Sequence, residues 1–172
     1  MGVPLIRRLA EGLSQRGFVA LRFDFGGVGL SGGSFTDGVE EPADVAGAVR
    51  YLESVREVDH HQVHLTGWSF GSWMALMALA EGLEAVTCIS IAPPLIAYDW
   101  RPQLPRISAS GAARHYIVGD SDQFCPLADL REFTSGISPH DAANVTVLPG
   151  IDHFLFGREP EVISMVAESL SK

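Results

Sequence analysis

Cysteine is scarce in this chain of 172 residues, which contains only Cys88 and Cys125. Two cysteines cannot build the disulfide framework that small secreted proteins use to support a limited core. Their spacing matches no metal-binding motif either, so we expect neither a metal nor a cofactor. A reducing compartment is the default for such a chain, and the sequence therefore predicts a cytoplasmic protein.

Long apolar runs are absent as well. Near the N-terminus the apolar pair Leu5 and Ile6 is followed at once by Arg7 and Arg8, so no signal-like apolar core builds up. No other window approaches the roughly 20 apolar residues that a membrane-spanning helix requires. We therefore expect neither a secretion signal nor a membrane anchor.

Positive charge is also in short supply, with 12 Lys and Arg against 21 Asp and Glu and a net charge of -9. Nucleic acids and anionic membranes are bound by clustered basic side chains, whereas the basic residues here are scattered, so we expect neither partner. Hydrophobic residues make up 47% and charged residues 19%, a balance typical of globular proteins. The length predicts a single domain over residues 1–172.

Apolar periodicity divides the chain into alternating helices and strands. The expected helices span residues 3–15, 42–55, 70–81, 127–135 and 159–170, and the expected strands span 18–25, 62–67, 85–91, 114–118 and 144–148. The apolar run at 18–25 is typical of a strand buried on both faces, and 92–111, with four prolines, is expected to be a loop. This alternation predicts an α/β fold: a mostly parallel sheet with flanking helices and functional sites at the carboxyl ends of its strands.

The run Gly-Trp-Ser-Phe-Gly at residues 67–71 lies between an expected strand and an expected helix. A Gly-x-Ser-x-Gly pattern at such a turn exposes a serine hydroxyl above a sheet, which makes Ser69 the candidate nucleophile. We expect Gly67 and Gly71 to relieve crowding, because a larger side chain at either position would collide with its neighbours. The backbone N–H of Phe70 and the helix dipole would stabilise negative charge beside Ser69.

A serine nucleophile needs a histidine base and an acid that orients it, in the chain order serine, acid, histidine. Of the six histidines, His153 follows the last expected strand in a loop, so we predict that it is the base. Asp120 and Asp122 both follow the strand at 114–118. We prefer Asp122 as the acid, because a residue further from the strand end reaches more freely over the sheet edge, and we keep Asp120 as the alternative.

These motifs resemble those of the α/β-hydrolases. The resemblance rests on Gly-Trp-Ser-Phe-Gly at 67–71, Gly-Asp-Ser-Asp at 119–122 followed by Pro126, and Leu-Pro-Gly-Ile-Asp-His-Phe at 148–154. Residues 21–33, Leu-Arg-Phe-Asp-Phe-Gly-Gly-Val-Gly-Leu-Ser-Gly-Gly, are similar to a segment of the compact bacterial, dienelactone-hydrolase-like members, which lack a large cap domain. This chain has Gly26 where those members usually have arginine.

The resemblance also implies that strands and a His-Gly-type loop precede the first helix, whereas this chain begins at that helix. That loop supplies one of two oxyanion-hole donors, and Phe70 supplies the other. Loss of one donor lowers turnover by about 10²- to 10³-fold, so we expect weak activity or none, restored by upstream sequence. The chain is then a fragment, a sequence with a misplaced start, or a shortened variant in which the strands at 18–25 and 62–67 pair directly.

Aromatic residues are frequent on the expected site loops: Trp68, Phe70, Trp73, Trp100, Phe124, Phe154 and Phe156. We expect two or three of them to contact substrate, with Trp68, Phe124 and Phe154 as the candidates. The preferred function is a serine hydrolase that cleaves small carboxylic esters or thioesters. The alternatives are a non-catalytic interaction module on the same fold, and an acyltransferase or peptidase with the same triad. The sequence leaves the oligomeric state open.

Overall fold

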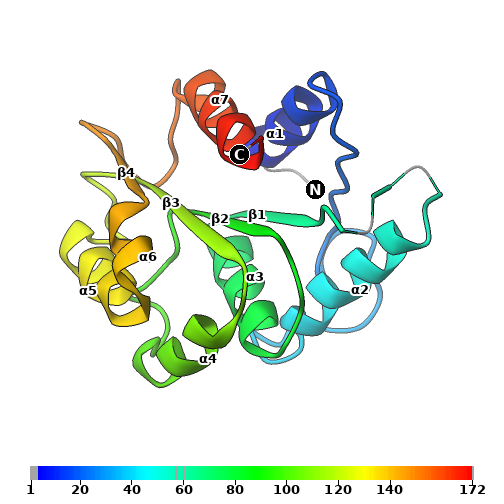
Figure 1. The fold of residues 1–172 in the computed structure, drawn as a ribbon, viewed down its shortest axis with the longest axis horizontal. Coiled ribbons are helices and arrows are strands. Elements are labelled where there is room, and N and C mark those ends of the chain that lie inside the picture. Colours follow the sequence, from blue (N-terminus) through cyan, green and yellow to red (C-terminus); the bar gives the residue numbers. More distant parts are fainter. Residues whose placement is uncertain (1–3, 57, 60, 172) are drawn as a thin grey trace.

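The computed structural model describes residues 4–56, 58–59 and 61–171. Its centre is a parallel sheet in the order β1-β2-β3-β4, formed by His64–Trp68, Thr87–Ile91, Ala113–Gly119 and Val145–Leu148 (Figure 1). Each strand pairs with the next one along the chain, from the register His64 with Thr87 to Gly119 with Leu148. The prediction of an α/β fold with a parallel sheet is confirmed.

Helices cover both faces of this sheet (Figure 1). The α-helices are α1 (Pro4–Ser14), α2 (Glu41–Glu53), α3 (Phe70–Ala80), α4 (Leu104–Ala109), α5 (Leu127–Ile137), α6 (Pro139–Ala143) and α7 (Glu159–Leu170), and η1 (Arg101–Gln103) is a 3₁₀-helix. Helices α1 and α7 lie on one face, and α2 to α6 lie on the other. Val3, where the first helix was expected to begin, lies outside the described residues.

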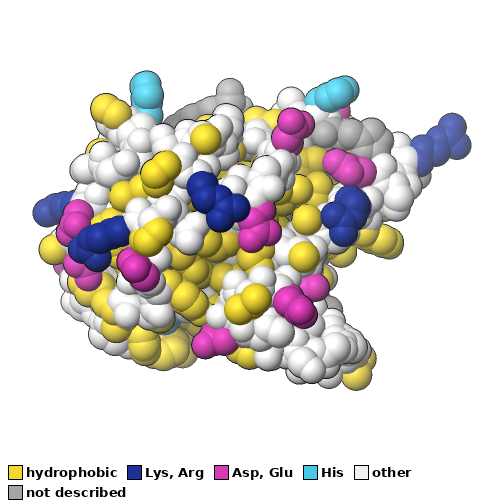
Figure 2. Space-filling model, turned by 90° about the horizontal axis from the view of Figure 1, so that it is seen from below, with side chains coloured by type: hydrophobic (Ala, Val, Ile, Leu, Met, Phe, Trp, Pro, Cys, Tyr) yellow, Lys and Arg dark blue, Asp and Glu magenta, His cyan; other side chains and the backbone are white. Residues whose placement is uncertain are grey.

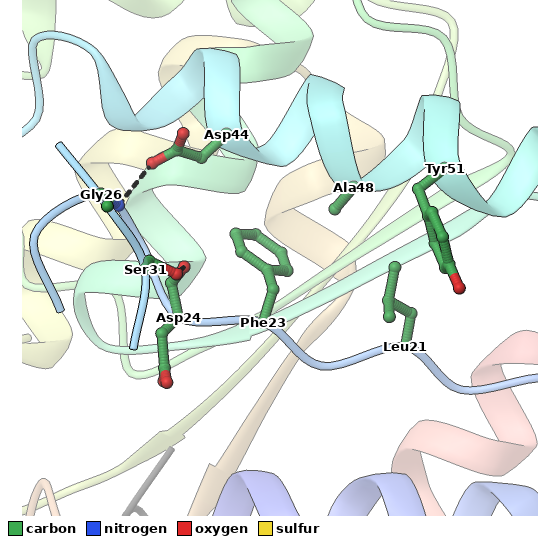
Figure 3. A pocket seen from close by; sticks show the side chains of 9 residues that line it. Leu21, Phe23, Asp24, Gly26, Ser31, Asp44, Ala48 and Tyr51 are labelled. Carbon is green, nitrogen blue, oxygen red and sulfur yellow. Dashed lines mark hydrogen bonds between the residues drawn. The ribbon is translucent and has the colours of Figure 1, made fainter. Parts of the chain in front are cut away.

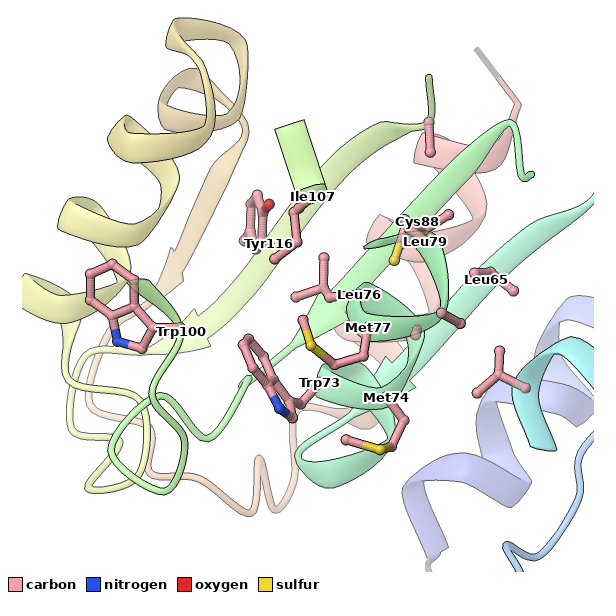
Figure 4. Packing of buried hydrophobic residues seen from close by; sticks show 14 of the residues in the cluster. Leu65, Trp73, Met74, Leu76, Met77, Leu79, Cys88, Trp100, Ile107 and Tyr116 are labelled. Carbon is pink, nitrogen blue, oxygen red and sulfur yellow. The ribbon is translucent and has the colours of Figure 1, made fainter. Parts of the chain in front are cut away.

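The helix that follows Ser69 lies at the centre of the larger core. Every residue of α3 from Ser72 to Leu79 is buried, and its neighbours are β1, β2, α2 and α4 (Figure 4). Strand β2 is buried along its whole length because it has a strand on each side and helices on both faces. A second core lies between the sheet and the pair α1 and α7. The nucleophile turn therefore lies directly before a helix that is buried over most of its length.

Three short helices were not expected from the sequence. Residues 92–111, predicted to be a loop, contain η1 and α4, and α6 follows α5 directly. All three have a proline in the first turn, where its fixed φ suits a helix and its missing N–H is no loss. Pro102 and Pro105, two of the four prolines in 92–111, thus lie in the first turns of helices.

The prediction of a buried strand at residues 18–25 is wrong. The segment runs beside β1: the ring of Phe18 lies 6.5 Å from that of His64, and the ring of Phe25 lies 5.2 Å from that of Phe70. No backbone hydrogen bond joins the two within the described part of the chain, so they do not pair directly. Val19, Leu21 and Phe23 are exposed. An apolar run becomes a buried strand only where a neighbouring strand pairs with it. The apolar composition of a run does not show whether such a neighbour exists.

A cavity of about 290 Å³ lies between this segment and α2 (Figure 3). Leu21 and Phe23 point toward Ala48 and Tyr51 of α2 across it. At one end the N–H of Gly26 donates to a carboxylate oxygen of Asp44 at 2.8 Å. This hydrogen bond attaches the glycine-rich loop to the helix. No residue of the nucleophile turn lines the cavity.

One face of the molecule is mixed in charge. Figure 2 shows the face below the view of Figure 1, where basic side chains lie apart from one another among acidic and apolar ones. No helix within residues 4–56, 58–59 and 61–171 is long and apolar enough to cross a lipid bilayer.

The buried carboxylate of Glu41 closes the loop that leads into α2. Its oxygens accept hydrogen bonds from the N–H of Thr36 at 2.6 Å, the hydroxyl of Thr36 at 2.8 Å and the N–H of Gly38 at 2.7 Å. Burial alone would raise the pKa of Glu41, but these hydrogen bonds to the charged form lower it to about 2. The ionised carboxylate is therefore part of the folded loop.

Glu41→Gln is expected to lower the free energy of unfolding at pH 7 by about 1.5–3 kcal/mol, the usual contribution of hydrogen bonds to a charged group. Because the folded pKa of about 2 lies below the ordinary 4.5, this contribution is present above pH 4.5 and is lost as the pH falls toward 2. Urea unfolding across that range should show the difference between wild type and variant shrinking. Glu40→Gln, at the exposed neighbouring position, is the control. A difference that stays constant with pH would contradict the assignment.

Candidate active site

The turn that carries Ser69 is backbone-strained and tied to the sheet. Ser69 has φ 52° and ψ -125°, a conformation that costs a non-glycine residue about 1–3 kcal/mol. The N–H of Ser69 donates to the carbonyl of Ile91, at the end of β2, at 2.9 Å. The N–H groups of Ser72 and Trp73 donate to the Ser69 carbonyl at 2.9 and 3.2 Å. Strand and helix together hold the serine hydroxyl at the carboxyl end of β1.

The two glycines of the motif have different environments. A Cβ on Gly67 would collide with the backbone of Gly71 and Ser72, so the prediction for Gly67 is confirmed. A Cβ on Gly71 would meet nothing within 4 Å, and the prediction of a collision there is wrong. The crowding is between the backbone of Gly71 and the Cα of Gly67. It leaves no room for a side chain at Gly67 but does not restrict a side chain at Gly71.

Ser69, His153 and Asp122 form one chain of hydrogen bonds. The Nε2 atom of His153 lies 2.8 Å from Oγ of Ser69, and its Nδ1 atom lies 2.9 Å and 3.0 Å from the two carboxylate oxygens of Asp122. Side chains that follow the ends of three separate strands, β1, β3 and β4, thus meet. His153 and Asp122 are both buried. An Nδ1–H tautomer satisfies both contacts, because it donates to the carboxylate and leaves Nε2 free to accept from the serine hydroxyl.

The buried carboxylate of Asp122 is held by the backbone of its own loop. Its Oδ1 accepts from the N–H groups of Phe124 and Cys125, each at 2.8 Å. Burying a carboxylate is costly unless hydrogen bonds compensate, and here two backbone donors and the imidazole do so. Cys125 is buried behind the loop, and burial raises the pKa of its thiol.

Asp120, the alternative acid, has another role in the structure. Its Oδ1 accepts from the N–H of Gly150 at 2.8 Å and from the hydroxyl of Ser121 at 3.0 Å. The N–H of Asp120 donates to the Leu148 carbonyl at 3.1 Å. Asp120 therefore joins the loop that follows β3 to the loop that carries His153.

Close approach of these two loops sets the distance between acid and base. The N–H of Ser121 donates to the carbonyl of Ile151 at 3.0 Å. A Cβ on Gly119 would collide with that same carbonyl, so only glycine fits there. This role of Gly119 was not predicted from the sequence, although a glycine that ends an apolar strand is a signal of close backbone approach.

Trp68 lies beneath the histidine loop. Its indole N–H donates to the backbone carbonyl of His153 at 3.0 Å, and its ring lies 5.4 Å from the imidazole. The rest of the side chain packs against the core under α1 and α7. This geometry makes Trp68 a positioning residue for His153, while its predicted contact with substrate stays a prediction.

Aromatic rings surround the triad on two sides. Beside the imidazole lie Phe124, with ring centroids 4.8 Å apart, and Phe154, at 5.7 Å. Beside the nucleophile turn, the ring of Phe70 contacts Phe35 at 5.2 Å and Tyr98 at 6.5 Å. Trp73 and Trp100, also expected near the site, are buried in the core.

The N–H of Phe70, the predicted oxyanion donor, is the first of helix α3. It has no acceptor within the described part of the chain. An uncommitted N–H at a helix N-terminus is available to an anionic oxygen, so this placement fits the predicted role. As for metals, no group of three or more His, Cys, Asp or Glu side chains among the described residues could hold an ion.

Comparison with known proteins adds the family. The family described as X-Pro dipeptidyl-peptidase (S15 family) matches residues 6–110, which is more than half of the chain. The chain belongs to the S15 peptidase family. This S15 family member has the α/β-hydrolase fold, as its resemblance implied. Its closer likeness to dienelactone-hydrolase-like proteins stays a prediction.

Solved structures support the same fold. An α/β serine hydrolase homologue from Coxiella burnetii is 27% identical, with a TM-score of 0.82 over 99% of this chain and 77% of that one. A putative α/β-hydrolase from Agrobacterium tumefaciens is 26% identical, with a TM-score of 0.83 over 99% and 77%. A serine hydrolase without a lid from Xanthomonas campestris is 26% identical, with a TM-score of 0.81 over 99% and 74%.

A curated relative, an uncharacterised protein from Rickettsia prowazekii, is 28% identical over 148 residues. The match covers 83% of this chain and 60% of the relative. The chain therefore spans about three fifths of the length of that relative.

Proposed function

We propose that this S15 family member is a serine hydrolase that cleaves carboxylic esters or thioesters through an acyl-enzyme. The observation that carries the proposal is the continuous hydrogen-bond chain from Oγ of Ser69 through His153 to Asp122. A serine hydroxyl is a weak nucleophile until a base takes its proton, and the Nε2 atom at 2.8 Å is within reach of that proton.

The geometry supports a two-step reaction. Nε2 of His153 takes the proton as Oγ of Ser69 attacks the carbonyl carbon, and Asp122 stabilises the imidazolium that forms. The carbonyl oxygen becomes negative and faces the N–H of Phe70 at the N-terminus of α3. The imidazolium then protonates the leaving oxygen or sulfur, the carbonyl re-forms and an acyl-serine remains. Water, activated by the same imidazole, releases the acid and restores the hydroxyl.

The match to the S15 family favours a second candidate, a peptidase. The same triad would attack an amide carbonyl, and the imidazolium would protonate a leaving amine. Parallel assays with an ester and with a dipeptidyl anilide that has proline next to the scissile bond separate the two candidates. Hydrolysis of the ester alone supports the esterase, and hydrolysis of the anilide at comparable efficiency supports the peptidase.

A fluorophosphonate probe is expected to label this chain at one position, Ser69. The reagent reacts with a serine only where a base activates the hydroxyl, so labelling tests activation directly. Labelling should disappear in Ser69→Ala and persist in Ser121→Ala, which removes a hydroxyl on the neighbouring loop. Peptide mapping identifies the modified residue. An unlabelled but folded wild-type chain would favour the non-catalytic alternative, and labelling that survives in Ser69→Ala would end the proposal.

A further inference from the structure

Three exposed phenylalanine rings lie together on the histidine side of the site. Phe124, Phe154 and Phe156 are 39%, 43% and 71% exposed. Phe154 and Phe156 stack nearly parallel, with an interplanar angle of 13° and ring centroids 5.7 Å apart, while Phe124 and Phe154 each contact the imidazole. Grouped exposed aromatic rings are unusual on a protein surface and mark surfaces that bind.

The local backbone holds two of these rings outward. Leu155, between them, is completely buried and has φ 55°, a strained value for a leucine. The N–H of Phe154 donates to a carboxylate oxygen of Asp152 at 3.0 Å, and the N–H of Arg158 donates to the Leu155 carbonyl at 3.1 Å. With Leu155 anchored in the core, its two neighbours face solvent. The phenylalanine surface is thus a built feature of the histidine loop.

The chemistry of the triad decides which half of a substrate lies there. The imidazolium must give its proton to the leaving oxygen, so that oxygen comes within hydrogen-bond distance of Nε2. The carbonyl oxygen faces the other way, toward the N–H of Phe70. The group attached to the leaving oxygen therefore continues past the imidazole. Phe124 and Phe154 lie there, because both rings contact the imidazole.

We propose that Phe124, Phe154 and Phe156 form a leaving-group subsite that selects esters of apolar alcohols, aliphatic or aromatic. This rests on the proposed serine-hydrolase function and adds which half of the ester is recognised. When an apolar alcohol packs on the exposed ring faces, the apolar surface of both the alcohol and the rings is removed from water, which is favourable. Phe35 and Tyr98 lie instead around Phe70, and among the described residues neither ring contacts the imidazole of His153.

Two ester series measured on the whole chain test the proposal. In the first series the acyl group is acetyl and the alcohol grows from methanol to butanol to hexanol. In the second the alcohol is methanol and the acyl group grows from acetyl to octanoyl. We measure kcat/KM, which for an acyl-enzyme reports the steps up to departure of the alcohol. The alcohol series should rise by roughly two- to fourfold per methylene group that reaches the rings.

Phe156→Ala should flatten the rise along the alcohol series and leave the relative rates of the acyl series unchanged. Phe156→Leu, which keeps an apolar side chain, should restore part of the rise. Phe35→Ala removes another exposed ring, 49% exposed against 71% for Phe156, that packs against Phe70, and it should leave the alcohol rise intact. Because each slope is a ratio within one variant, a general loss of activity does not affect it.

A flat alcohol series from a chain whose Ser69 is labelled by the fluorophosphonate overturns the subsite while the proposed function stands. A slope that Phe156→Ala leaves unchanged, or that Phe35→Ala abolishes instead, also overturns it. Failure of a folded chain to be labelled overturns the proposed function itself, so the two failures are distinguishable.

Discussion

Ser69→Ala is expected to lower ester turnover by about 10⁶-fold, and His153→Ala by nearly as much, because each member of a triad acts only through the others. Nε2 of His153 lies 2.8 Å from Oγ of Ser69. The serine is therefore not activated without the histidine, and the histidine has no proton to accept without the serine. Initial rates with a short p-nitrophenyl ester give the two values.

The double variant Ser69→Ala with His153→Ala is the decisive comparison. Its turnover should match that of Ser69→Ala alone, whereas independent residues would give multiplied losses. Circular dichroism and thermal unfolding show whether each variant keeps the fold. Additive losses, or a Ser69→Ala protein that retains its rate, would contradict the assignment of Ser69 and His153.

Asp122→Asn is expected to lower turnover by about 10⁴-fold with the fold intact. The Oδ1 atom of Asp122 accepts two backbone N–H groups, so an asparagine would keep its amide oxygen there. Its amide nitrogen would then face Nδ1 of His153 as a donor and select the tautomer with the proton on Nε2. That tautomer presents a donor to Ser69 and cannot accept its proton.

Asp120→Asn is the matched control, two positions away in the same loop. An asparagine oxygen can still accept from the N–H of Gly150 and the hydroxyl of Ser121, so the loss should stay below about tenfold. Comparing kcat/KM of the two variants on one ester gives the answer. A crippled Asp120→Asn beside an active Asp122→Asn would reverse the assignment of the acid.

The sequence was sufficient for features that depend on neighbouring residues. The period of apolar residues predicted the sheet strands β1 to β4 and the main helices, because that period reports which side of a helix or strand is buried. The Gly-x-Ser-x-Gly pattern located Ser69, since a strained turn between strand and helix has few possible sequences. The chain order of serine, acid and histidine singled out His153, and the structure brings all three residues together.

Contacts between distant residues decided the rest. Residues 18–25 have the composition of a strand, but a strand also needs a hydrogen-bonded neighbour, and none pairs with them in the described part of the chain.

Asp120 and Asp122 look alike in sequence. They differ because one carboxylate faces Gly150 and the other faces His153 across the two joined loops. Gly67 is crowded and Gly71 is not, because only the path of the helix shows which backbone approaches which. Patterns along a chain report short-range preferences, whereas pairing, close approach and the direction of a side chain arise from packing between segments far apart in sequence.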